Sequence, residues 1–170
     1  MSVTCRQNFH EDCEAGINKQ INMELSASYI YHALGHLCER EDVAFPGLAK
    51  YFKKASEEER EHADKFMDYQ HKRGGKIVYH DIKRPDVEAY KSPKAMLTFA
   101  LSLERDVNQA LLDLHAVADK HGDAQMADFI EGEYLKEQVE GEKELSDLIT
   151  RANRCGDGLG AFMFDKEAFE

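Results

Sequence analysis

The residues best suited to chemistry in this chain are Glu59 and His62, which form a Glu-x-x-His motif. On a helix, side chains three residues apart lie on nearly the same face. That face is otherwise apolar, with Phe52 and Ala55 before the motif and Phe66 after it. Burying a carboxylate and an imidazole there is costly unless a partner compensates their polarity, and a metal ion compensates both. The alternative is a salt-bridged helix surface, which is the usual explanation of an isolated Glu-x-x-His motif.

Three further segments of helical character each carry one polar residue in the middle of an apolar stripe. These residues are Glu24, Glu104 and Gln138, and their apolar neighbours recur at helical spacing. Taken singly, each residue could lie at the edge of its stripe and reach solvent. Together with the Glu-x-x-His motif, they predict that four helices direct oxygen and nitrogen donors into one core.

The predicted donors are carboxylates, an amide and an imidazole, without a thiolate. Such ligands suit iron or manganese better than copper(I) or structural zinc. Three acids and one histidine suffice for two metal ions only if a carboxylate bridges them. We expect Glu59 to be the bridging residue, because it is nearest to His62.

Hydrophobic periodicity predicts four long helices in this chain. They cover about residues 12–38, 46–73, 92–120 and 123–153. Pro46 and the Ser92-Pro93 pair are typical of helix starts, because serine caps free amides and proline fits the first turn. The short connection between the first two helices indicates that they are antiparallel neighbours.

Residues 76–91 lack helical periodicity and form a long connection for a compact domain. A four-helix bundle with one crossover along its length accommodates such a segment. After a glycine-rich hinge at residues 156–160 comes a short apolar segment. We therefore predict an all-α fold in a single domain, residues 1–170, with a four-helix bundle over about 11–153. The bundle has one long crossover connection and a short fifth helix at the C-terminus, over about 160–169.

The composition restricts the possible partners of this chain. A formal net charge of -11 at pH 7 makes nucleic acid and anionic membranes poor partners, and cations good ones. No apolar run approaches membrane-spanning length, and the N-terminal residues contain no apolar core of a secretory signal. The four cysteines are scattered without a Cys-x-x-Cys spacing, which favours reduced thiols. We expect a cytoplasmic protein.

Nine segments together resemble the heavy-chain, ferroxidase-active type of eukaryotic ferritin, in register over nearly the whole chain. They are Arg6–Phe9, Ile21–Glu24, Ala27–Tyr31, Ala49–Phe52, Glu58–His62, Arg73–Gly75, Val107–Gln109, Glu137–Val139 and Phe164–Lys166. The resemblance implies a ferritin-like bundle that assembles into a hollow twenty-four-subunit shell, either a homo-oligomer or one mixed with other ferritin chains. It also implies iron storage and ferroxidase activity. Fe(II) is oxidised by dioxygen at a di-iron site within the subunit, and Fe(III) is stored as a mineral.

The resemblance also implies roles for individual residues. The first iron site would comprise Glu24, Glu59 and His62, and the second would comprise Glu59 and Glu104 with Glu58 close by. Gln138 would hydrogen-bond metal-bound water or oxygen, and Tyr31 would orient Glu104. Iron is then both substrate and the occupant of the di-iron centre, and other divalent cations can occupy the same sites. Because the fourth helix offers Gln138 instead of a second Glu-x-x-His motif, the second site should hold iron more loosely.

Two further acidic sets match positions of the family. Glu58, Glu61 and Asp64 recur every three residues and would seed mineral on the cavity side. An ordinary solvated acidic face is an equally good interpretation of these three residues. His115, Asp128 and Glu131 match the lining of the threefold ion channels, where carboxylates would concentrate Fe(II).

The chain departs from the ferritin pattern at some positions. Ala127 stands where many heavy chains have cysteine, so a thiol ligand in the channel is lost. Ser26 replaces an aromatic residue that is common at its position. His32 and His36 form a His-x-x-x-His pair, which we interpret as exposed histidines rather than as an extra metal site.

Three other functions compete with a ferroxidase. A shell subunit could nucleate and store mineral while oxidation occurs elsewhere, although the retained site residues argue against it. A helical adaptor would make the buried acids incidental. A rubrerythrin-like peroxidase is disfavoured, because a second Glu-x-x-His motif and a four-cysteine iron site are both missing.

Overall fold

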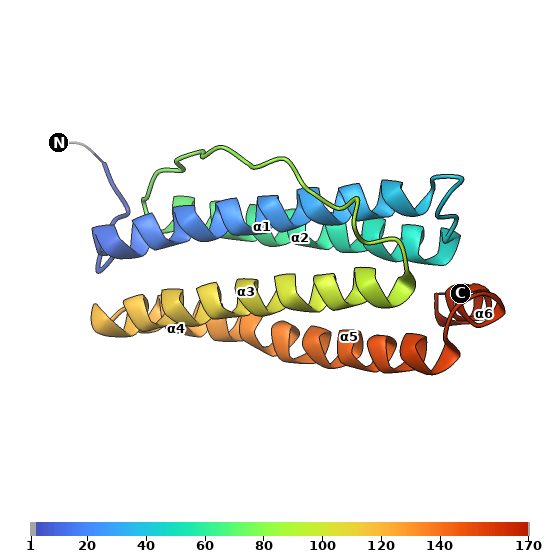
Figure 1. Ribbon diagram of the computed structural model, residues 1–170. Helices are drawn as coiled ribbons and strands as arrows, with labels where there is room; N and C mark the ends of the chain where they lie inside the picture. The colour runs from blue at the N-terminus through green and yellow to red at the C-terminus, as the bar shows by residue number, and fades with distance from the viewer. Residues whose placement is uncertain (1–2, 170) are drawn as a thin grey trace.

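The computed structural model describes residues 3–169, which form a bundle of long helices (Figure 1). Helix α1 spans Glu11–Cys38, α2 spans Pro46–Lys72, and α3 spans Pro93–Lys120. The fourth rod consists of α4 (Ala124–Ile130), the π-helical segment η1 (Glu131–Leu135) and α5 (Lys136–Cys155). Helix α6 (Leu159–Ala168) lies across one end of the bundle. Residues 3–169 contain no strand, so the predicted all-α four-helix bundle with a short C-terminal helix is confirmed. Over the same residues, no helix combines the length and the apolar character that crossing a membrane requires.

The crossover between α2 and α3 runs along the bundle beside α1 (Figure 1). Because it has no helix or strand of its own, its backbone polar groups need other partners. The side chain of Asn18 supplies two of them, since Nδ2 donates to the Lys76 carbonyl at 2.9 Å and Oδ1 accepts from the Val78 amide at 3.0 Å. Asn22 donates to the Asp81 carbonyl at 3.3 Å. Polar residues of α1 therefore hold the long connection in place.

Helix α6 caps the start of α2. Pro46 opens α2, and the preceding residue makes no side-chain capping hydrogen bond. The carboxylate of Asp165 instead accepts from the Gly47 amide at 2.9 Å and from the Leu48 amide at 2.7 Å. An anionic acceptor at a helix N-terminus satisfies free amides and interacts favourably with the helix dipole. Together with buried Phe164, this contact fixes the C-terminal helix to its own subunit.

The apolar core has two parts. The part nearer α6 is formed by residues such as Leu34, Leu48, Phe52, Leu97 and Leu145. The part at the other end is formed by residues such as Ile17, Phe66, Leu111, Met126 and Ile130. On α2, α3 and the fourth rod, the polar residues that interrupt the apolar stripes fall between these two parts. The bundle thus carries a polar layer in the middle of a hydrophobic interior.

The fourth rod differs from the uninterrupted helix predicted over residues 123–153. A π turn over Glu131–Leu135 interrupts it, and such a turn changes the face on which the following residues lie. Buried Tyr134 lies in this turn and donates its hydroxyl to the His62 carbonyl at 2.9 Å. Because hydrophobic periodicity predicts regular helices, it gives no sign of this turn.

Candidate metal centre

The polar layer contains one residue or pair from each rod of the bundle. Glu24 comes from α1, Glu59 and His62 from α2, Glu104 from α3, and Gln138 from α5. All five are at most 9% exposed, and Glu24 is fully buried. The structure therefore brings together the stripe-interrupting residues of four separate helices.

Glu24, Glu59 and His62 form the most compact part of the layer. Each offers a donor atom that lies within 4.8 Å of the donors of the other two. Nδ1 of His62 is 3.5 Å from Oε2 of Glu59. Among the described residues, Oε2 of Glu24 and Oε2 of Glu59 have no hydrogen-bond partner although both atoms are buried. Because an unpaired buried oxygen is costly, this arrangement fits a cation that binds both carboxylates.

Glu104 is held beside this group by two neighbouring helices. The hydroxyl of Tyr31 donates to Oε1 of Glu104. The amide of Gln138 donates to Oε2 of Glu104 at 3.0 Å and to its carbonyl at 3.1 Å. These bonds orient the carboxylate, as is typical of groups behind a metal ligand. Oε1 and Oε2 each retain a lone pair that a metal ion can use.

The protonation of the buried acids depends on a cation. Burial, and next the charge of Glu59, raise the pKa of Glu24 well above its usual range. Burial, and next the charge of Glu104, raise the pKa of Glu59. Both groups therefore favour the neutral form when no cation is present. A divalent ion would stabilise the ionised carboxylates, so metal binding and proton release are linked at this site.

Hydrogen bonds between α1 and α2 fix the register of the site. Ser28 donates its hydroxyl to the Ser56 carbonyl at 2.7 Å, and Ser56 donates to the Ser28 carbonyl at 2.8 Å. Gln20 donates to Oε1 of Glu24 at 2.8 Å. The roles of Ser28, Ser56 and Gln20 were not predicted from the sequence. Their spacing of one helical turn from Glu24 or Glu59 was the available signal.

Sequence reasoning also missed Glu137, which precedes Gln138. Its Oε2 lies 3.3 Å from Nε2 of His62, and its side chain is 55% exposed. Glu137 lines a cavity of about 340 Å³ that also includes Glu59, His62 and Glu104. The rim of this cavity carries further exposed acids, namely Glu58, Glu140 and Glu144. The cavity thus joins the buried centre to an acidic surface.

Comparisons with known proteins agree with this fold and donor set. Residues 14–155 match the Ferritin-like domain family. The chain belongs to this family.

It is 57% identical to the soma ferritin of Lymnaea stagnalis over 168 residues, which cover 98% of this chain and 97% of that protein. It is 53% identical to the ferritin heavy chain of Echinococcus granulosus over 165 residues, 97% of this chain and 95% of that protein. The Ferritin-1 heavy chain of Schistosoma mansoni is 52% identical over 163 residues, 96% of this chain and 94% of that protein. The resemblance to heavy-chain ferritins is confirmed.

In this ferritin chain, the predicted nucleation residues lie on the exposed side of α2. Glu58, Glu61 and Asp64 are all exposed. Glu58 pairs with Lys54 at 2.8 Å, and it lies at the rim of the cavity rather than in the buried layer. Its carboxylate can therefore meet an ion that enters or leaves the centre.

The predicted channel residues of the ferritin chain lie near the start of the fourth rod and on α3. Nε2 of His115 is 2.6 Å from Oε1 of Glu131, so the structure pairs these two side chains. Asp128 is exposed on α4.

The positions at which this ferritin departs from the family pattern have simple local environments. Ser26 donates its hydroxyl to the Asn22 carbonyl at 2.6 Å. His32 and His36 are both exposed, with their ring centroids 4.6 Å apart. Ala127 is buried in the apolar core, where it supplies no metal donor.

Proposed function

We propose that this ferritin-family chain stores iron and is a ferroxidase. It oxidises Fe(II) with dioxygen at a di-iron site within the subunit and stores Fe(III) as a mineral inside a shell. The observation that supports this proposal is the buried pair of carboxylates, Glu24 and Glu59, each with an oxygen that lacks a partner among the described residues. Iron is the substrate of the reaction before it is a stored product.

Two iron positions account for the donors in the polar layer. Glu24, Glu59 and His62 hold the first Fe(II) ion, and Glu59 and Glu104 hold the second. Glu59, whose donor atom lies within 4.8 Å of those of Glu24 and His62, bridges the ions. Tyr31 and Gln138 position Glu104 through the hydrogen bonds that they donate to it. Other divalent cations with oxygen and nitrogen preferences, such as Mn²⁺, can occupy the same donors.

Anionic carboxylates stabilise Fe(III) relative to Fe(II), which makes the bound ions reducing toward dioxygen. Each of two Fe(II) ions loses one electron, and dioxygen takes up both electrons with two protons to give hydrogen peroxide. Hydrolysis of each Fe(III) ion by two waters then gives ferric oxyhydroxide and three protons. Fewer protein ligands at the second position favour release of the product over permanent binding.

Exposed acids provide a path for iron on either side of the centre. His115, Asp128 and Glu131 form the entry channel where subunits meet, and the two carboxylates concentrate Fe(II). Glu58 at the cavity rim, with Glu61 and Asp64 on the same helix, receives Fe(III) and seeds mineral. The exposure of all three α2 acids supports this assignment.

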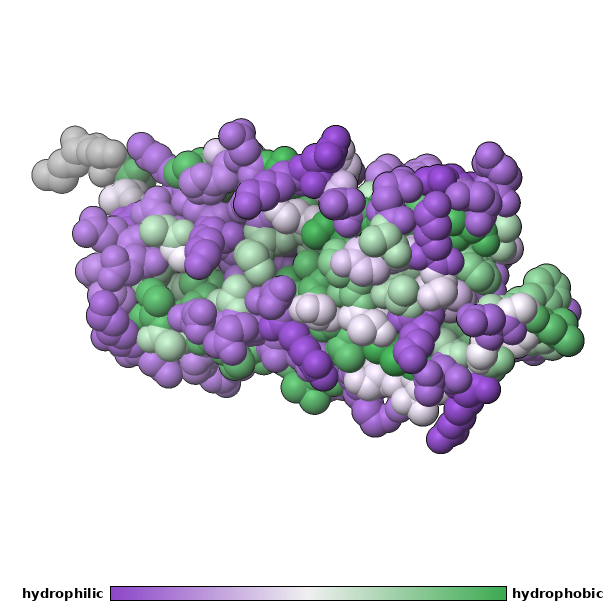
Figure 2. All heavy atoms as spheres, in the orientation of Figure 1, coloured by the Kyte–Doolittle hydropathy of each residue, from purple (hydrophilic) through white to green (hydrophobic). Residues whose placement is uncertain are grey.

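The surface supports assembly into a twenty-four-subunit shell, from this chain alone or together with other ferritin chains. Hydrophilic and hydrophobic residues are interspersed over the face in Figure 2, and α6 at the end of the bundle presents hydrophobic atoms. Leu159, Phe162 and Met163 are 75%, 61% and 41% exposed on this helix. Exposed apolar residues that are grouped in this way mark contact surfaces between subunits. The four unpaired cysteines support a reducing, cytoplasmic location.

Oxygen consumption tests the ferroxidase activity directly. The iron-free protein is mixed with a small excess of Fe(II), and oxygen uptake and Fe(III) absorbance are followed together. The parent protein is expected to oxidise two Fe(II) ions for each dioxygen in a fast initial phase. His62→Gly is expected to lose that phase. His36→Gly, which changes an exposed histidine on α1, is expected to keep it.

Two outcomes would contradict the proposal. If the parent and His62→Gly oxidise iron at the same slow rate, the polar layer is not catalytic and the chain only stores mineral. If the purified protein is a monomer or dimer by light scattering, the shell is wrong.

A further inference from the structure

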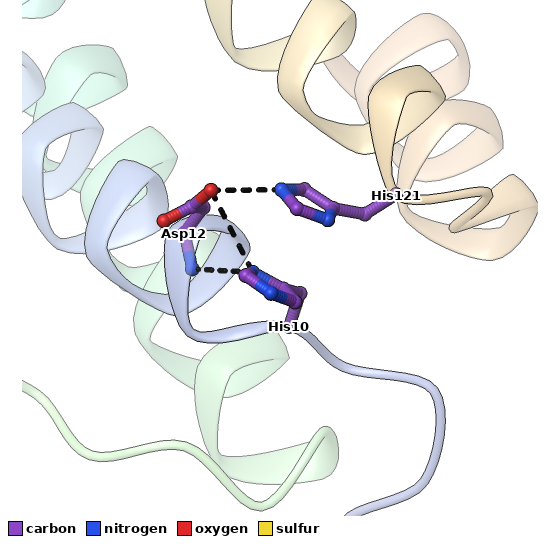
Figure 3. A group of neighbouring side chains, drawn as sticks. All are labelled: His10, Asp12 and His121. Carbon is purple, nitrogen blue, oxygen red and sulfur yellow. Dashed lines mark hydrogen bonds and ion pairs between the residues drawn. The ribbon is translucent and has the colours of Figure 1, made fainter.

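A second group of histidine and carboxylate side chains lies at the end of the bundle opposite α6 (Figures 1 and 3). His10 immediately precedes α1, Asp12 lies in the first turn of α1, and His121 follows the last turn of α3. None of these residues belongs to the polar layer or to the predicted ion channel. Their donor atoms lie within 4.8 Å of one another.

Both imidazoles approach the same carboxylate oxygen. Oδ2 of Asp12 lies 2.8 Å from Nε2 of His121 and 3.7 Å from Nδ1 of His10. The two rings are stacked, with centroids 3.6 Å apart and planes inclined by 11°, and both present a nitrogen to Asp12 (Figure 3). Ligands about 2.0–2.1 Å from a tetrahedral ion are separated by about 3.3 Å. The two observed N···O separations lie on either side of this value. Because an imidazole binds an ion in the plane of its ring, the exposed ring of His10 would turn out of the stack, and Nε2 of His121 would exchange its hydrogen bond to Asp12 for the ion.

The nitrogen of His10 is in the form that metal binding requires. Its Nδ1 accepts a hydrogen bond from the Asp12 amide at 3.1 Å, and therefore carries a lone pair rather than a proton. An ion at Nδ1 would replace this hydrogen bond. The released amide can bond to water, because His10 and Asp12 are exposed.

The surrounding charges permit a cation at this place. The positive end of α1 and the negative end of α3 meet here, so their dipoles partly cancel. Asp12 contributes a full negative charge, and the hydrogen bond from His121 is the main cause of the lowered pKa of its carboxyl group. Lys120 lies with its Nζ 3.7 Å from Oδ2 of Asp12, and its exposed side chain can move away when an ion binds.

We propose that His10, Asp12 and His121 bind a divalent transition-metal ion such as Zn²⁺ at the outer end of the subunit. Two imidazole nitrogens and one carboxylate oxygen, without a thiolate, suit zinc and neighbouring ions of the first row. Three protein ligands leave the fourth position to water. The ion joins the start of α1 to the end of α3, which are distant in sequence. This site is separate from iron oxidation, since it shares no residue with the di-iron site.

Anomalous diffraction and calorimetry test this site with Zn²⁺ as the probe. Crystals of the assembled, iron-free protein are soaked in Zn²⁺, and data are collected on both sides of the zinc absorption edge. A peak is expected about 2.0–2.2 Å from the nitrogens of His10 and His121 and from the Asp12 carboxylate. In calorimetric titration, His121→Gln is expected to bind about one Zn²⁺ ion per chain fewer than the parent, because a ligand is lost.

Two variants separate ligand loss from structural damage. His10→Asn removes an imidazole but supplies a side chain that caps a helix well, so α1 should be unchanged while the Zn²⁺ ion is lost. His80→Gln removes an exposed histidine of the crossover and should bind as many ions as the parent. The proposal is overturned if no anomalous peak lies at the cluster, or if both cluster variants bind as much Zn²⁺ as the parent. Because ion counting requires no iron oxidation, this test is independent of the ferroxidase test, and His121→Gln should oxidise Fe(II) at the parental rate.

Discussion

The buried centre and the cluster at the end of the bundle use the same side-chain types in opposite environments. Glu24 is fully buried, and one of its carboxylate oxygens has no partner among residues 3–169. The side chain of Asp12 is 48% exposed, and its carboxylate interacts with both histidines and Lys120. The pKa of Glu24 is therefore raised by burial, whereas that of Asp12 is lowered by its hydrogen bond to His121.

This comparison shows what burial adds to a group of metal donors. In the centre, ionised carboxylates need a cation, because Glu24 and Glu59 are buried and each keeps an oxygen without a hydrogen-bond partner among the described residues. At the end of the bundle, the Asp12 carboxylate is stable without an ion. The affinity of this cluster for a metal ion depends only on how its donor atoms are placed. The buried centre is thus suited to the proposed pair of iron ions and to proton release, and the exposed cluster is suited to one exchangeable ion.

The largest effect is expected from Glu59→Gln, which removes the only carboxylate shared by both proposed iron positions. Removing a group that only supports a metal ligand lowers activity by about 10–100-fold. Removing the shared ligand itself should therefore slow the fast phase of Fe(II) oxidation by at least about 100-fold. Stopped-flow absorbance measures this phase. Glu57→Gln, an exposed acid two residues earlier on α2, is the matched control and should keep the parental rate. Equal rates in the two variants would contradict the shared position.

A smaller effect is expected from Tyr31→Phe, which removes the hydroxyl that donates to Glu104. The carboxylate remains but is less well oriented, so the initial oxidation rate should fall by about tenfold. The affinity for the first iron should change little, because Glu24, Glu59 and His62 are retained. Tyr29→Phe changes an exposed tyrosine on the same helix and should have no effect. A parental rate in Tyr31→Phe would show that Gln138 alone positions Glu104.

Glu24→Gln should stabilise the metal-free subunit while removing an iron ligand. Because the folded-state pKa of Glu24 is raised, the folded protein binds more protons than the unfolded chain, and parental stability falls as pH rises through that range. The variant lacks this dependence, so its advantage should grow from pH 5 to pH 8 and reach on the order of 1 kcal/mol. Unfolding in guanidinium with a chelator present measures it. If the free energies of unfolding of the variant and the parent differ by the same amount across this pH range, Glu24 does not titrate.

Asp12→Asn should show the opposite dependence on pH, with the smallest effect. The pKa of Asp12 is lowered in the folded state, so its contribution to stability is present above its usual value and is lost as pH falls through the folded value. The variant should therefore be slightly less stable than the parent at pH 7 and equal to it in strong acid. The same guanidinium titrations provide the measurement. If the variant loses more free energy of unfolding at low pH than at pH 7, the assignment of Asp12 is contradicted.

Helical spacing found the buried donors because each of them interrupts a long and regular apolar stripe. Glu24 among Ile17, Ile21 and Tyr31 is visible in the sequence, since a helix repeats the same face at fixed intervals. Glu137 was missed because its neighbours indicate an exposed face, and only the approach of His62 gives it a role. The π turn at Glu131–Leu135 was missed because it breaks the assumed period.

The amino-acid sequence alone determined the four amphipathic helices, the long crossover and the buried position of their polar residues. Those properties follow from local periodicity, which depends on neighbours within two or three turns. The tertiary structure alone decided which oxygen atoms are left without partners, which helix caps α2, and which distant residues meet. Asp12 and His121 are 109 residues apart in the chain, and only the packing of α1 against α3 places their side chains 2.8 Å apart. Contacts of this kind depend on how helices pack against one another, and the spacing of residues along the chain does not specify that packing.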